Sequence, residues 1–318
     1  MDYTVSKNII PEDNNRRGKI ILIDHFPILK GADMHTPRAH IAFLSTFALI
    51  FLSAFCFACT AKRLTSVQQY HPEPPQLTVE QQREFLLTAK VVRYRHSDKG
   101  ITNSYQLTLS DGKITHDASF QSINERRSWK DLDRGGEANF VDSYLYNLAA
   151  YELAKLIGLE DMLPVTVERK WGGDTGSLTW WLPVQMSIGE KEDKNIHPPD
   201  LPAWNNSMYK VRIFTQLIYD TDRSNPDNIL IGNNWEVYMI DFSRAFRLYH
   251  DLKNPDDLVC CARKLLEKLR ALDAEEVEAN LGKYLNELEL KGIMKRRDKI
   301  VDYFEKLIAE KGEAAVLY

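Results

Sequence analysis

The chain has 318 residues, of which 44% are hydrophobic and 27% are charged, a composition typical of globular proteins. Its formal net charge is −4, and Lys and Arg are interspersed with acidic residues. This balance argues against a nucleic-acid-binding protein, which usually carries a basic surplus on at least one segment. The cysteines form two close pairs in sequence, Cys56 with Cys59 and Cys260 with Cys261, which predicts neither a disulfide framework nor a zinc site.

An apolar segment lies near the N-terminus. Residues 41–61 contain no charged side chain over a length that could span a bilayer, and small residues gather at the end of the segment. A start at Met34 would place Arg38 before this apolar run, as in a secretory signal. We therefore expect residues 1–33 to be a non-native or disordered extension and residues 34–61 to be a signal peptide or membrane anchor.

The segment 34–61 predicts an exported or membrane-anchored protein of the bacterial envelope or periplasm. Ala58 and Cys59 weakly match a lipoprotein cleavage box, so lipidation of Cys59, simple cleavage, an uncleaved anchor and a buried helix remain alternatives. Residues 62–83 contain three prolines and no apolar periodicity, which is typical of a linker.

The next part of the chain shows the period-two alternation of strands. We expect strands at residues 85–94, 101–109 and 113–123, joined by turns that contain Gly100 and Gly112. Apolar residues then recur at helical spacing from Val141 to Leu156, and Gly158 is expected to end that helix. Two further strands are expected at residues 165–168 and 178–182.

The second half of the chain is mainly helical in its pattern. Residues 190–202 carry charges and three prolines, which predicts a surface loop or a connection between lobes. A helix is expected from Met208, followed by a loop and a strand at residues 235–240. Amphipathic helices are expected between residues 256 and 310.

Three polar residues have the order needed for phosphoryl transfer. Asp222 and Asn228 lie in a loop after a helix, and Asp241 ends a strand. Such transfer needs a carboxylate to orient the attacking hydroxyl, plus a carboxylate and an amide to hold metal on the phosphates. Asp222 is expected in the first role, and Asn228 and Asp241 are expected to bind Mg²⁺ or Mn²⁺. Arg223 is the candidate that would neutralise phosphate charge.

Each part of this pattern has an ordinary structural explanation. Loops rich in Asp, Asn and Pro are most often turns, and an Asp can simply end a strand. The order of the three residues, the preceding helix and the apolar run Ile229–Ile231 together favour the functional interpretation.

Two motifs, Asp222-Arg223…Asn228-Ile-Leu and Ile240-Asp241-Phe242, resemble the catalytic and metal-binding loops of atypical kinases. These include phosphatidylinositol 3/4-kinases, bacterial toxin kinases and secretory-pathway kinases. The resemblance implies an α+β, two-lobed protein-kinase-like fold. Residues 84–189 would form an antiparallel β small lobe with one long helix, and residues 190–318 a mainly helical large lobe.

The chain departs from the usual kinase pattern at four places. Asn228 follows Asp222 by six positions rather than five, Ser243 replaces the Gly after Asp-Phe, and no glycine-rich phosphate loop is present. Gln121 stands where a strand Lys should grip the phosphates, and it cannot supply that positive charge. The resemblance places Glu137 beside a phosphate-binding cation or a metal, and Gln185 and Met186 at an adenine-binding hinge.

The sequence thus predicts a kinase-like phosphotransferase that binds ATP and Mg²⁺ or Mn²⁺. The acceptor would be a hydroxyl of a protein, lipid or small molecule, with a membrane contact through residues 34–61 and no nucleic-acid partner. The departures at Gln121 and Ser243, together with an envelope location where ATP is scarce, keep an alternative open. In that alternative, the chain is an inactive kinase-fold binding or scaffold protein.

Overall fold

The computed structural model describes residues 77–96, 104–132 and 135–318. The predictions for residues 1–61, including the signal or anchor segment and Cys59, lie outside the described residues. Within the described ranges, no helix combines the length and the apolar character needed to cross a membrane.

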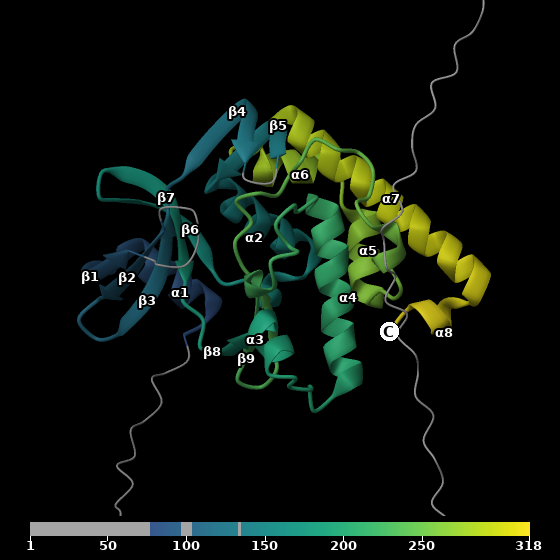
Figure 1. Cartoon of the computed structure of the whole chain (residues 1–318), viewed down its shortest axis with the longest axis horizontal. Coiled ribbons are helices and arrows are strands. Elements are labelled where there is room, and N and C mark those ends of the chain that lie inside the picture. Colours follow the sequence, from purple (N-terminus) through teal and green to yellow (C-terminus); the bar gives the residue numbers. More distant parts are fainter. Residues whose placement is uncertain (1–76, 97–103, 133–134) are drawn as a thin grey trace, which may run out of the picture. The chain divides into compact units, whose positions relative to one another are not determined.

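A five-stranded antiparallel sheet forms one side of the folded unit (Figure 1). Its strand order is β1-β2-β3-β7-β6. The strands are β1 (Lys90–His96), β2 (Ser104–Ser110), β3 (Thr115–Gln121), β6 (Thr166–Trp171) and β7 (Asp174–Trp180). Leu107 of β2 and Phe120 of β3 are at most 1% exposed, because alternate residues of each strand face the core.

Helix α1 (Val79–Thr88) precedes the sheet and corrects two predictions. It begins inside the segment predicted as a linker, and it contains residues 85–88, which were expected to start a strand. Thr78 and Gln81 form a capping box, and buried Phe85 and Leu86 give the helix its inner face. Arg169 of β6 donates hydrogen bonds to the Leu86 and Ala89 carbonyls at 2.5 and 2.6 Å, which satisfies the C-terminal end of the helix.

A two-stranded hairpin, β4 (Asn124–Leu132) and β5 (Gly135–Ser143), stands between β3 and the next helix. The sequence predicted no strands here, and it placed the start of the next helix at Val141, which belongs to β5. The hairpin is largely exposed and rich in charge, so it has no clear apolar alternation. Figure 1 shows it extending over the end of the unit where α6 (Ala274–Leu281) and α7 (Glu287–Lys311) lie.

Helix α2 (Leu145–Ile157) lies between the sheet and the helical part of the unit (Figure 1). Gly158 ends it with φ of 73°, a left-handed conformation that glycine adopts without strain. The predicted helix end is therefore confirmed. Leu148, Leu153 and Ile157 are at most 2% exposed, so this helix packs on both of its neighbours.

The rest of the chain is mainly helical, as predicted for the large lobe. The connection predicted as a loop at residues 190–202 instead begins in a short helix, because Ser187 and Glu190 form a capping box. A small antiparallel sheet of order β10-β9-β8 combines one strand that precedes the long helix α4 with two strands that follow it. The bounds are β8 (Val184–Ser187), α3 (Ile188–Asp193), α4 (Leu201–Ile218), β9 (Ile229–Gly232), β10 (Val237–Met239), α5 (Arg263–Ala271) and α8 (Glu313–Val316).

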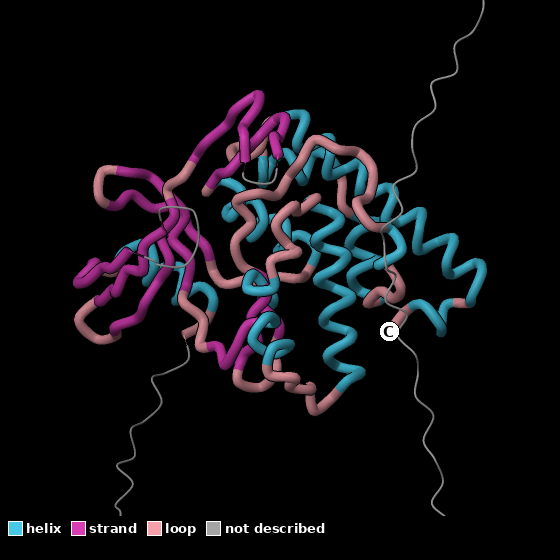
Figure 2. Tube along the Cα trace, in the orientation of Figure 1, coloured by secondary structure: helices cyan, strands magenta, loops and turns pink. Residues whose placement is uncertain are grey.

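One buried apolar core extends from the sheet through α2 to α4, α5 and α7. Arg296 of α7 is fully buried, and it donates hydrogen bonds to the carbonyls of Leu217 and Arg247 at 2.8 and 3.0 Å. It thereby joins α7 to the end of α4 and to the segment that follows the predicted metal loop. The long loops of the unit lie between the sheet and the helices (Figure 2).

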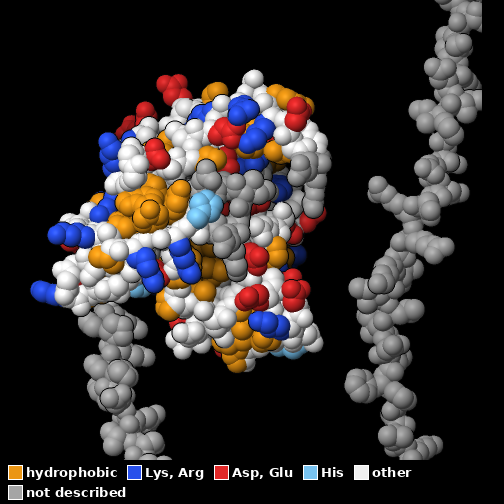
Figure 3. Space-filling model, turned by 60° about the vertical axis from the view of Figure 1, so that its left-hand side comes forward, with side chains coloured by type: hydrophobic (Ala, Val, Ile, Leu, Met, Phe, Trp, Pro, Cys, Tyr) orange, Lys and Arg blue, Asp and Glu red, His pale blue; other side chains and the backbone are white. Residues whose placement is uncertain are grey.

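The outer surface carries both apolar and charged side chains. Figure 3 shows apolar side chains gathered on the sheet side of the unit, close to Lys and Arg. Exposed Val92 and Tyr94 of β1 are among the apolar residues of the sheet, and the Tyr94 ring packs edge-on against Trp171 at 5.3 Å. Such edge-to-face contacts stabilise aromatic groups that the core does not enclose.

The position of α2 in the core yields a prediction about stability. Replacing Leu153 by Ala should lower the free energy of unfolding by about 2–5 kcal/mol, because Leu153 is 0% exposed and its removal leaves a cavity. Leu156, on the half-buried side of the same helix, is the matched control and should cost clearly less. Urea unfolding would measure both. Equal losses would contradict this packing of α2.

Candidate functional site

The loop after α4 is shaped by a buried carboxylate that the sequence analysis did not single out. Tyr219 ends α4 in a left-handed conformation, with φ of 47°. Asp220 is 0% exposed and accepts a hydrogen bond from the Asp222 backbone N–H at 2.9 Å. It also pairs with the Arg223 guanidinium at 2.6 Å. A buried carboxylate with these partners fixes the course of the loop.

Arg223 joins the two loops that were predicted to carry the chemistry. Its side chain is 6% exposed and donates to the backbone carbonyls of Asn228 at 2.6 Å and Ile240 at 3.0 Å. The guanidinium also lies over the Phe242 ring, 4.7 Å from the centroid. These contacts assign Arg223 a positioning role. The predicted neutralisation of phosphate charge by Arg223 stays a prediction.

The side chains of Asp222 and Asn228, both predicted site residues, contact each other. The Asn228 side-chain amide donates to the Asp222 Oδ2 atom at 3.0 Å, and Asn228 is buried at the foot of the loop. Burial raises the pKa of Asp222, the nearby Asp220 charge raises it further, and the Asn228 hydrogen bond opposes the rise. The extra residue between Asp222 and Asn228 therefore does not prevent their contact.

Asp241 follows β10 in a left-handed conformation with φ of 54°, which is unusual for a residue with a side chain. The Ser243 backbone N–H donates to its Oδ1 atom at 3.4 Å. Burial raises the pKa of Asp241, and the charges of Asp222 and Asp142 add to the rise. Asp222 and Asp241 therefore act electrostatically on each other in one site.

Asp142, near the end of β5, is a third carboxylate of this site that the sequence analysis missed. It is 7% exposed, and its Oδ1 atom has no hydrogen-bond partner among the described residues. Burial raises the pKa of Asp142, while the Ser243 side chain and the charges of Arg244 and Lys130 oppose the rise. Only knowledge of the β4–β5 hairpin could have revealed it, because the hairpin carries Asp142 toward Asp241.

Gln121, which was predicted to stand at the lysine position of kinases, lies at the end of β3 and contacts α2. The Asn147 side chain in α2 donates to Gln121 Oε1 at 2.6 Å. The Asn147 Oδ1 atom accepts a hydrogen bond from the Phe242 backbone N–H at 2.8 Å. A chain of neutral amides thus connects the strand, the helix and the loop of Asp241. Asn147 was not predicted, because an Asn within a helical pattern carries no distinguishing signal.

Glu137 lies on β5, and two arginines form ion pairs with it. Arg247 pairs with it at 2.5 Å, and Arg244 pairs with its other carboxylate oxygen. The Arg244 guanidinium also lies over the Phe140 ring at 4.3 Å. The charge of Arg244 lowers the pKa of both Asp222 and Asp142, so Arg244 is a cation that faces the acidic site.

The predicted hinge residues lie in β8, after the connection from β7. Met186 pairs with Ile231 of β9, and the exposed Gln185 side chain donates to the Gly232 carbonyl at 2.7 Å. These contacts place Gln185 and Met186 on the three-stranded sheet that β8 forms with β9 and β10. Their predicted contact with adenine stays a prediction.

The donor set of the site fits a divalent metal that also binds phosphate. No group of three or more His, Cys, Asp and Glu residues in the described ranges could by itself hold a metal ion. Mg²⁺ and Mn²⁺ sites on nucleotides need less, because one or two carboxylates, waters and the phosphate oxygens complete the coordination. Asp241, Asn228 and the unpaired oxygen of Asp142 supply such a set.

Comparison with solved structures identifies the architecture. A hydra Fam20 solved with sugar has a TM-score of 0.54 and 15% sequence identity, and the match covers 76% of this chain and 92% of that chain. The Golgi casein kinase has a TM-score of 0.53 and 14% identity, covering 75% and 78%. The chain has an atypical kinase fold.

The likeness to these kinases extends over the described unit but is confined to the fold. The Golgi casein kinase solved with Mn/ADP bound is similar at a TM-score of 0.52 and 14% identity. No protein-family model and no curated protein sequence matches the chain. The similarity to the solved kinase structures confirms the predicted α+β, two-lobed fold.

The raised pKa values of the site predict a dependence of stability on pH. In the metal-free protein, charged Asp241 is unfavourable in the folded state, so this cost grows as the pH rises from the ordinary carboxyl range through the raised folded pKa. The Asp241→Asn variant should unfold at a higher temperature than the wild type at neutral pH. This gain should shrink toward low pH, where Asp241 is protonated.

Thermal unfolding across the pH range, in the presence of a chelator, would measure the difference between the two proteins. Asp256→Asn, which alters an exposed carboxylate, is the control and should show no comparable gain. A variant that is less stable than the wild type at neutral pH would contradict a strained carboxylate at position 241.

Proposed function

We propose that the chain is an ATP-dependent kinase that uses Mg²⁺ or Mn²⁺ and phosphorylates a hydroxyl group. The observation that carries this proposal is the convergence of Asp222, Asn228 and Asp241 in one site of a kinase fold. The Mn/ADP bound to the structurally similar Golgi casein kinase supports the choice of ligands. The acceptor can be a protein, a lipid or a small molecule.

The residues of the chain have separate parts in this function. Asp241 and Asn228, with Asp142 beside them, hold the metal, which neutralises phosphate charge when bound. Asp222 orients the acceptor hydroxyl and accepts its proton, and the raised pKa of Asp222 suits an acceptor of protons. Arg244, held by Glu137, faces the same acidic site and supplies positive charge that Gln121 does not.

A second candidate function is a kinase-fold binding protein without turnover. Gln121 and Asn147 form a neutral contact where kinases place a Lys–Glu ion pair, so no strand cation grips the α- and β-phosphates. This protein would bind nucleotide or a partner chain. The predicted signal or anchor segment 34–61 would place it at the cell envelope. Binding without transfer would favour this second candidate.

Nucleotide binding is the first test of the proposal. ATP with Mn²⁺ at about 100 times the dissociation constant should stabilise the folded chain by about 2.7 kcal/mol. Asp241→Asn should abolish the metal-dependent part of this gain, and Asp256→Asn should leave it unchanged. Thermal shift on the full chain measures both. No shift with millimolar ATP would overturn nucleotide binding.

Turnover separates the two candidate functions. In Asp222→Asn, nucleotide binding should persist, whereas release of ADP with an acceptor should fall by roughly 10²–10⁴-fold, the usual contribution of a general base. Coupled detection of ADP measures this. Equal turnover in the wild type and Asp222→Asn would contradict the role of Asp222.

A further inference from the structure

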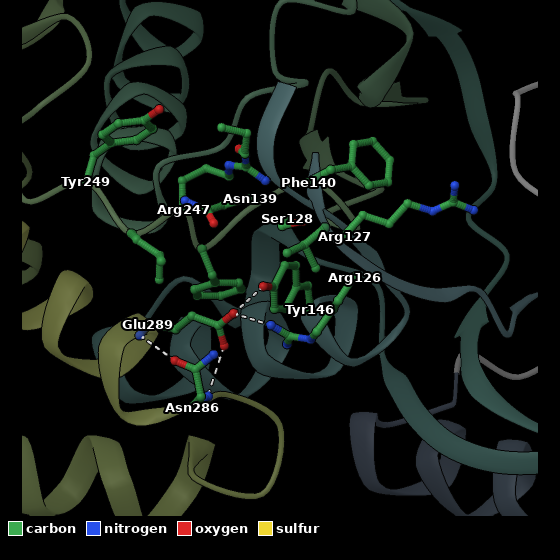
Figure 4. A pocket seen from close by; sticks show the side chains of 14 residues that line it. Arg126, Arg127, Ser128, Asn139, Phe140, Tyr146, Arg247, Tyr249, Asn286 and Glu289 are labelled. Carbon is green, nitrogen blue, oxygen red and sulfur yellow. Dashed lines mark hydrogen bonds and ion pairs between the residues drawn. The ribbon is translucent and has the colours of Figure 1, made fainter. Parts of the chain in front are cut away.

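A cavity of about 520 Å³ opens beside the acidic site but contains none of its three carboxylates. Its walls come from the β4–β5 hairpin, the start of α2, residues 246–249 and the start of α7 (Figure 4). This volume falls in the range of sites for small molecules, about 300–1,000 Å³. Kinase folds need no such cavity for the reaction described above, so it requires its own explanation.

One acidic side chain in the cavity is already satisfied. Glu289 of α7 is 1% exposed, and its Oε1 atom accepts hydrogen bonds from Arg126 at 2.7 Å and from the Tyr146 hydroxyl. Its Oε2 atom accepts from the Asn286 backbone N–H at 2.9 Å. Figure 4 shows these partners around Glu289. Glu289 therefore braces the wall and does not offer a free acceptor to a ligand.

Arg247, in contrast to Glu289, has a hydrogen-bonding group that no described residue satisfies. Its side chain is 6% exposed, and its Nη2 atom contacts Glu137 at 2.5 Å and the Ala138 carbonyl at 3.2 Å. The Nη1 atom is buried and has no hydrogen-bond partner in the part of the chain that the structure describes. A buried guanidinium N–H without a partner is costly. Because Arg247 lines the cavity, an anion bound there is the partner that relieves this cost best once the guanidinium turns toward it.

The surroundings of Arg247 favour a phosphate group on a small molecule. Arg126 lines the same cavity with a 40% exposed side chain, so its guanidinium has further N–H groups to donate. Arg127 extends away from the cluster in Figure 4 and pairs with Glu125. Arginine forks match phosphate oxygens, and the Phe140 and Tyr249 rings give the remaining walls an apolar character.

We propose that this cavity is a second site, in which Arg247 and Arg126 bind the phosphate group of a small molecule. Arg247 shares Glu137 with Arg244, which faces the acidic site. A ligand on Arg247 thus changes how Glu137 holds Arg244, and in this way it modulates the acidic site. This coupling rests on the proposed function, whereas the binding itself does not.

The test is calorimetric titration of the full chain with inorganic phosphate and, separately, with a hexose phosphate. Both should bind to the wild type, and Arg247→Gln and Ser128→Glu should each weaken binding by about tenfold or more. Ser128 is an exposed residue that lines the cavity, so the substitution adds a repelling charge without disturbing the core. Thr115→Glu, at an exposed position of β3, is the matched control and should bind as the wild type does.

Further titrations distinguish a phosphorylated small molecule from free phosphate, and binding in the cavity from binding in the acidic site. Tighter binding of the hexose phosphate would identify a phosphorylated small molecule, and equal binding would identify free phosphate as the ligand. Asp241→Asn should bind phosphate normally even though it loses metal-dependent nucleotide binding. The proposal is overturned if neither probe binds, or if Ser128→Glu binds as tightly as the wild type.

Discussion

The burial of three carboxylates, two of which act electrostatically on the third, Asp241, is the constraint on which the rest of the site depends. Asp142, Asp222 and Asp241 come from three separate segments, and burial raises the pKa of each one. Such an arrangement is unfavourable unless cations lie near it or bind to it. The structure meets part of this need with Arg244 and Lys130, whose charges lower the pKa of Asp142. A metal ion with its nucleotide would meet the remainder.

The scaffold around these carboxylates is held by contacts that leave the reactive oxygens available. Arg223 uses its guanidinium on Asp220 and on backbone carbonyls, which fixes the two loops relative to each other. Asn147 joins Gln121 to the Phe242 backbone in a neutral contact. This neutral contact carries no positive charge, whereas Arg244 lies in the segment after Asp241 and acts on Asp222 and Asp142.

The sequence predicted the parts of the fold and site that rest on local patterns. The end of α2 at Gly158 follows from residue type and spacing. The order of Asp222, Asn228 and Asp241 identified the loops, but not the contact that Asn228 makes with Asp222. The β4–β5 hairpin could not be predicted, because its charged and exposed strands lack an apolar alternation. Asp142 was therefore invisible as a site residue. The partners of Arg223 are backbone carbonyls, which no side-chain pattern encodes.

We propose that the acidic site binds a divalent metal together with nucleotide. Electron paramagnetic resonance of Mn²⁺ tests it directly, because the signal of free Mn²⁺ is lost as the ion binds to protein. The account predicts that the chain and ADP together remove about one equivalent of Mn²⁺ signal beyond what ADP removes alone, and that Asp142→Asn weakens this uptake. Equal uptake with and without the protein would contradict the account.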